Sequence, residues 1–118
     1  MSDQILVIVV DPEAKTIQAD TIDDNLTSMQ QMVGGNIERV MAPLGDEAEI
    51  LWIDEEGKLK ENFHFNVKGF PDIIAGKAFI CREVDGPNGL VNGDTDLDVA
   101  AVQSLVTWLP HLDNQALL

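Results

Sequence analysis

The stretch Ile5-Leu6-Val7-Ile8-Val9-Val10 is unbroken in its apolar character and mostly β-branched. Such a run is typical of a strand that lies at the centre of a sheet and is buried on both faces. A turn containing Pro12 follows, and Thr16-Ile17-Gln18-Ala19 then alternates in polarity, which predicts a second strand that pairs back onto the first. The run is also far shorter than the roughly 20 apolar residues of a membrane span.

Two later segments have helical spacing. Leu26, Met29 and Val33 recur on one helical face and precede Gly34-Gly35, so we predict a short helix over about residues 24–33 that ends at the glycines. A second helix is predicted over residues 95–109, where apolar residues again recur at helical spacing, with Thr95 as its start and Pro110 as its end.

The remaining segments read as strands and loops. We predict strands at 37–41, 49–53 and 78–81, a hairpin turn at 54–58 with a short returning arm at 58–60, and a structured loop or short helix at 61–72. These elements indicate an α+β fold in which a mixed or antiparallel sheet of about five strands is covered by the two helices. We expect one compact domain over residues 1–118, with frayed ends at 1–3 and 113–118.

The charge restricts the function. The chain has 21 acidic residues against seven Lys and Arg, a formal charge of −14, and all of its bases except Lys15 and Arg39 lie between Lys58 and Arg82. Direct binding to nucleic acid or to an anionic membrane needs clustered positive charge, so we exclude both. The start of the sequence lacks the basic and long apolar segments of a signal peptide, and one cysteine cannot form an internal disulfide; we therefore expect a cytoplasmic protein.

Catalytic and metal-binding patterns are weak. Cys81, His64 and His111 are the candidates for a nucleophile and a base, but Cys81 lies inside an apolar strand and is expected to be a buried, inert thiol. The acids at 94, 96 and 98 lack the glycine and glutamate that a calcium loop needs at its sixth and twelfth positions. We expect no cofactor and no metal.

Two surfaces are candidates for binding. Phe63, Phe65 and Phe70 lie close together in the sequence beside Lys68, which suggests either a small core beneath a loop or a surface for a protein partner or a homodimer. The densest acids are Asp46 and Glu47 and the run Asp54-Glu55-Glu56. They are either a solvated hairpin tip or an acidic face that mimics the phosphates of DNA.

Four segments together resemble a known family. The segment Leu26–Val40, with Val33-Gly34-Gly35 followed by Ile37-Glu38-Arg39-Val40, is similar to the helix–glycine–strand segment of the domain of unknown function 3846 family. The hairpin-like residues 54–59, the segment 72–76 and the apolar strand 78–81 follow in the order seen in that family. The resemblance implies a small protein of phages, plasmids or their hosts, and it implies no activity and no functional residue.

The sequence therefore leaves three functions open. The first is a small acidic accessory protein of phage or mobile-element type that acts through protein–protein contacts without catalysis. The second is a DNA mimic that inhibits a DNA-binding or restriction protein, and the third is a small enzyme.

Overall fold

The computed structural model describes residues 3–60 and 63–110, which form an α+β fold that is rich in strands. Within these ranges the elements are β1 (Gln4–Asp11), β2 (Thr16–Asp23), α1 (Leu26–Val33), β3 (Ile37–Val40), β4 (Glu49–Asp54), the 3-10 helix η1 (Gly57–Leu59), β5 (His64–Val67), β6 (Ile73–Ala75), β7 (Ala78–Gly86), β8 (Gly89–Gly93), α2 (Val99–Gln103) and β9 (Val106–Trp108). The predicted α+β class is confirmed. The predicted arrangement, one sheet of about five strands covered by two helices, is only roughly correct, because the described residues form a six-stranded and a three-stranded sheet.

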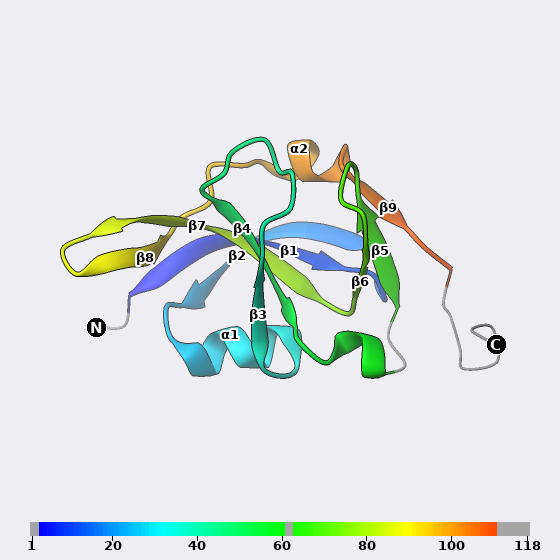
Figure 1. Cartoon of the computed structure of the whole chain (residues 1–118), viewed down its shortest axis with the longest axis horizontal. Coiled ribbons are helices and arrows are strands. Elements are labelled where there is room, and N and C mark those ends of the chain that lie inside the picture. The colour runs from blue at the N-terminus through cyan, green and yellow to red at the C-terminus, as the bar shows by residue number, and fades with distance from the viewer. Residues whose placement is uncertain (1–2, 61–62, 111–118) are drawn as a thin grey trace.

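A large antiparallel sheet runs through the middle of the molecule in the order β2-β1-β7-β4-β3, and β8 pairs with the outer part of β7 (Figure 1). Strand β1 pairs with β2 over its full length and with β7 at Ile8, Val9 and Val10. The strand predicted from residues 5–10 therefore has neighbours on both sides, as its continuous apolar run indicates.

The large sheet buries a different apolar set on each face, because successive side chains of a strand point to opposite sides. On β1, Ile5 and Val7 belong to a cluster with Met29 and Val33 of α1. Ile8 and Val10 belong to a second cluster that includes residues of the smaller sheet and of α2. The large sheet is thus covered by α1 on one face and by the smaller sheet and α2 on the other.

Helix α1 confirms the first predicted helix. Asn25 is its N-cap, with a side-chain oxygen that accepts from the Ser28 backbone N–H at 2.8 Å. Gly34 ends it in the left-handed conformation, with φ of 84°, which glycine adopts without a Cβ clash.

The smaller sheet, in the order β6-β5-β9, corrects the prediction of a loop or short helix at 61–72. Phe65 and Val67 alternate with polar neighbours and are buried in the core, and this favours a strand. Residues 61 and 62 lie outside the described residues.

The predicted helix over 95–109 is wrong for most of its length. Helix α2 spans only Val99–Gln103, its N-cap is Asp98 rather than Thr95, and Val106–Trp108 form strand β9 against β5. The β-branched and aromatic residues of this segment suit a strand, and the Trp108 ring packs edge-on against Phe65 at 6.3 Å. Tertiary pairing with β5 outweighs the helical spacing.

The predicted hairpin at 54–60 is also wrong. After β4 the chain makes a turn and the short helix η1, and no strand is formed by Lys58–Lys60 within the described residues. A Cβ added to Gly57 would lie 2.6 Å from the carbonyl oxygen of Ala75, so this glycine allows η1 to pack directly against β6.

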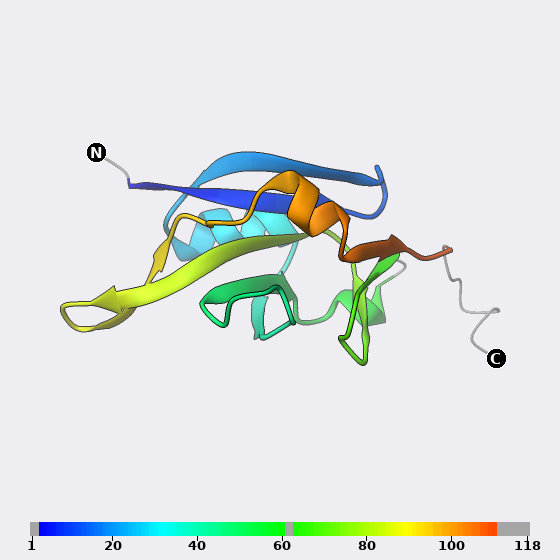
Figure 2. The ribbon, with the colours of Figure 1, turned by 90° about the horizontal axis from the view of Figure 1, so that it is seen from above.

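The molecule measures 49 × 27 × 22 Å along its principal axes, and the β7–β8 hairpin extends at one end (Figures 1 and 2). No helix in the described part of the chain has the length and apolar character needed to cross a membrane. Fraying is predicted for residues 1–3 and 113–118, and of these only residue 3 is among the described residues. The carbonyl of Asp3 accepts from the Asp24 N–H at 2.9 Å.

Candidate functional site

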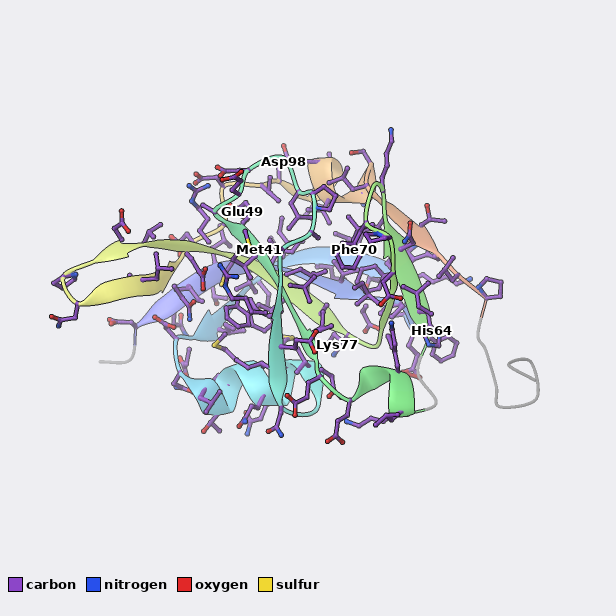
Figure 3. The ribbon with its side chains drawn as sticks, viewed as in Figure 1. Met41, Glu49, His64, Phe70, Lys77 and Asp98 are labelled. Atoms are coloured by element: carbon purple, nitrogen blue, oxygen red, sulfur yellow. The ribbon has the colours of Figure 1, made fainter. Side chains whose placement is uncertain are left out.

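A hollow of about 470 Å³ lies between two loops, and we call it the loop hollow. One wall is the segment 41–47 between β3 and β4, together with Glu49 at the start of β4. The other wall is the β5–β6 loop at 69–71. Both loops project on the same side of the molecule (Figure 2), and Figure 3 marks Met41, Glu49 and Phe70. Most of the exposed lining is apolar, and Met41 is 57% exposed.

The first wall is anchored in the hydrophobic core. Ala42 and Leu44 are buried and belong to the core cluster between the sheets, whereas Met41 and Pro43 are exposed. The Leu44 N–H donates to the Ala42 carbonyl at 2.8 Å, which tightens the loop. Two residues fixed in the core thus hold the two exposed apolar residues in place.

The second wall is held by one side-chain amide. The Asn66 Nδ2 atom donates to the carbonyl oxygens of Phe70, at 3.3 Å, and of Asp72, at 3.1 Å. Gly69 has φ of 83°, and a Cβ added to it would lie 3.4 Å from Cγ of Pro43 on the opposite wall. The two loops therefore meet beside Gly69, and contacts within the chain itself hold both walls.

The end of the hollow at Glu49 carries an ion-pair network. Nη1 of Arg82 lies 2.8 Å from Asp46, 3.2 Å from Glu49 and 3.1 Å from Asp96. The Glu49 side chain is fully buried, and its carboxylate also accepts from the Thr95 hydroxyl and from the Asp96 N–H. A buried carboxylate needs such partners, because burial penalises its charged form.

Asp46 also stabilises the first loop. Its carboxylate accepts from the Ala48 N–H at 2.9 Å, and this bond together with the Arg82 guanidinium holds the pKa of Asp46 below its ordinary value. The bond with Asp46 in turn raises the pKa of Arg82, so this ion pair is charged at neutral pH. Asp46 nevertheless remains 48% exposed and Asp96 76% exposed.

The structure separates the predicted contact residues. Phe70 is half-buried and lines the loop hollow, and Lys68 is exposed on the same β5–β6 loop. Phe65 has no exposed surface and belongs to the core, which corrects its placement in a contact surface. Phe63 is half-buried and lines a different hollow, of about 340 Å³, together with Lys77.

The predicted acidic face is not continuous. Asp46 and Glu47 precede β4, and Asp54, Glu55 and Glu56 lie at its far end, six residues of strand away. Asp54 is buried, with a side chain only 4% exposed, and it forms an ion pair with Lys60. Asp54 is therefore a structural residue, which corrects its assignment to a DNA-mimic surface.

The candidate nucleophile Cys81 and the candidate base His64 lie in different sheets. Cys81 lies in β7 within the cluster beneath α1, and burial raises the pKa of its thiol to about 11. This confirms the expectation of a buried thiol, whereas its lack of reactivity stays a prediction. His64 belongs to β5 of the smaller sheet, and His111 lies outside the described residues.

Sequence reasoning did not identify Met41, Pro43 and Pro71 as surface residues. A local signal is present, since each loop places a large apolar residue near proline and glycine, in Met41–Gly45 and Gly69–Pro71. Such residues next to turn-forming positions are often exposed. The pairing of the two loops has no local signal.

The comparisons with known proteins identify a family. The family Domain of unknown function (DUF3846) matches residues 4–102, from β1 into α2. No curated protein and no solved structure matches the chain. Because the match covers most of the sequence and every element that forms the large sheet, the chain belongs to the family Domain of unknown function (DUF3846).

Proposed function

We propose that this protein is an accessory protein that acts by contact with another protein, without catalysis, and that the loop hollow is its contact site. The observation that supports this most directly is the exposed Met41 beside the half-buried Phe70, in a hollow whose walls are already fixed. Apolar residues held open to solvent at such a site favour binding of a partner. Methionine adapts its shape to different apolar partners and is common at such surfaces.

The chemistry of the hollow supports binding over catalysis. The buried Glu49 would be the natural general base there, but its oxygens already accept from Thr95, Arg82 and the Asp96 N–H. A general base needs a free oxygen directed at its substrate. Glu49 instead fixes the floor of the hollow by joining β4 to β7 and to the segment before α2.

The test compares two substitutions at equal exposure. Met41→Ser removes the apolar side chain from the hollow, and Leu26→Ser removes one from the start of α1, where Leu26 is also 57% exposed. Neither side chain is buried, so both variants should keep the stability of the wild type to within about 0.5 kcal/mol. Wild type and Leu26→Ser should then retain the same protein from a lysate of the source cells.

Met41→Ser should bind that protein about five- to thirtyfold more weakly, which corresponds to a loss of roughly 1–2 kcal/mol of apolar contact. Titration of the purified partner by calorimetry measures the difference. The proposal is refuted when the wild type retains no partner, or when all three proteins bind it equally. The proposed setting, a phage, a plasmid or a host that carries one, is tested by the neighbourhood of the gene.

A further inference from the structure

We propose that the loop hollow takes a cationic segment of a partner protein, in which one large apolar side chain is followed or preceded by Lys or Arg. This inference rests on the proposed function and adds the chemistry of the partner. The apolar residue would lie between Met41 and Phe70, and the cation would lie at the acidic end of the hollow, near Glu47.

The acidic end of the hollow is not neutralised by the chain itself. Arg82 is the one cation that contacts Asp46, Glu49 and Asp96 in the described residues, so a single guanidinium faces three carboxyl groups. Glu47 is exposed, lines the same end and adds a further negative charge. The side chains of Asp46 and Asp96 are half and three-quarters exposed, so a partner can reach their carboxylates.

No charged residue lines the opposite wall, although Lys68 and Asp72 flank it on the same loop. It consists of Gly69, Phe70 and Pro71, and Pro43 of the first wall approaches it at Gly69. An occupant therefore meets an apolar surface at one end and carboxylates at the other. A segment with an apolar and a cationic residue side by side satisfies both ends, whereas an acidic segment would be repelled.

A second copy of this chain is a poor occupant. The chain has only seven Lys and Arg for 21 acids. Arg39, Lys58, Lys60 and Arg82 already form ion pairs within the chain. Two copies, each of formal charge −14, would also repel each other on approach, whereas a basic partner would be attracted.

The experiment selects binding peptides from a displayed library of random sequences, with the whole purified protein as bait and Met41→Ser as the counter-selection. Peptides that depend on Met41 should be enriched in Lys or Arg next to a large apolar residue. Their affinity should fall as salt is raised, because the Debye length shortens from about 8 Å at physiological ionic strength to about 3 Å at 1 M. The selected peptide is then the probe for the variants.

The double variant Glu47→Gln, Asp96→Asn should bind this peptide about two- to twentyfold more weakly, since each exposed ion pair contributes at most about fivefold, and should show a shallower salt dependence. The control Glu13→Gln, Asp85→Asn makes the same change in net charge at exposed acids that neither line the hollow nor pair with Arg82, and its affinity should match the wild type.

The outcomes separate the two proposals. Met41-dependent peptides that are neutral or acidic, or an equal loss of affinity in both double variants, would overturn the cationic partner and leave the contact site intact. An absence of any Met41-dependent peptide would overturn the contact site itself. A dimer in light scattering that Met41→Ser dissociates would place a second copy in the hollow and also overturn the cationic partner.

Discussion

Gly35 should be replaceable by alanine only when Asp54 is shortened as well. A Cβ built on Gly35 lies 2.7 Å from Oδ1, 2.9 Å from Cγ and 2.9 Å from Oδ2 of Asp54, all closer than real Cβ contacts. The Asp54 carboxylate cannot move away freely, because it is buried, accepts from the Glu56 N–H at 2.9 Å and pairs with Lys60 at 2.5 Å. The Asp54 carboxylate thus occupies the position that a side chain at residue 35 would need.

The expected magnitude follows from this overlap. Forcing an extra methyl group into a filled site costs about 1–3 kcal/mol, so Gly35→Ala should lower the free energy of unfolding by that amount. All three close atoms belong to the Asp54 side chain beyond Cβ, and Asp54→Ala removes them all. The φ of Gly35 lies outside the left-handed region, so alanine can adopt the same backbone conformation. In the Asp54→Ala background, Gly35→Ala should therefore stabilise the protein by about 0.4–1 kcal/mol, because alanine lowers the conformational entropy of the unfolded chain.

The assay is a double-mutant cycle by urea unfolding, followed by tryptophan fluorescence, with the four proteins compared at one pH. The sign of the Gly35→Ala effect should reverse between the two backgrounds, with a coupling energy of roughly 1.5–4 kcal/mol. Gly34→Ala is the matched control: Gly34 has φ of 84° and nothing within 4 Å of an added Cβ. It should cost about 1 kcal/mol in both backgrounds, because its penalty is conformational.

An equal loss for Gly35→Ala with and without Asp54 would refute the steric reasoning. The glycine would then be needed for its backbone conformation, like Gly34, and the close approach to Asp54 would have no energetic role.

Three further predictions concern stability and reactivity. The Cys81 thiol has a pKa of about 11, so roughly one thiol in a thousand is ionised at pH 8. An aromatic disulfide reagent should therefore leave Cys81 unmodified in the native protein and react with it only on unfolding. Modification of the native protein at the rate of a free thiol would contradict this. Asn25→Ala removes the cap on the Ser28 N–H and should cost about 1 kcal/mol in urea unfolding, and an unchanged midpoint would show that the cap is dispensable. The pKa of Asp46 is below its ordinary 3.8 in the fold, so the contribution of Asp46 to stability is present above pH 3.8 and is lost as the pH falls through the folded pKa. Asp46→Asn should therefore make the free energy of unfolding less sensitive to pH in that acid range. An unchanged pH dependence would speak against the bonds with Ala48 and Arg82.

Local patterns predicted the elements that depend on nearby residues. The apolar run of residues 5–10 indicates a central strand, and the spacing of Leu26, Met29 and Val33 with the glycines after them predicts α1 and its end. These signals are reliable because the alternation of a strand and the capping of a helix involve residues only a few positions apart.

The predictions failed where distant residues decide the outcome. Val106 continues the helical spacing of the segment before it, but hydrogen bonding to β5 makes Val106–Trp108 a strand. Phe65 belongs to a group of neighbouring phenylalanines that suggested a contact surface, but it is fully buried in the core. Propensity is a weak local preference, and burial against a partner element overrides it.

For this protein, the sequence alone determines the acidic character, the α+β class, the central strand and the first helix. The tertiary structure decides that Met41 and Phe70 share one hollow, that Glu49 and Arg82 form its acidic end and that Gly35 makes room for Asp54. The physical reason is that these pairs are distant in the sequence, so that only strand pairing and core packing bring them together, and no local period or cap records which strands will pair.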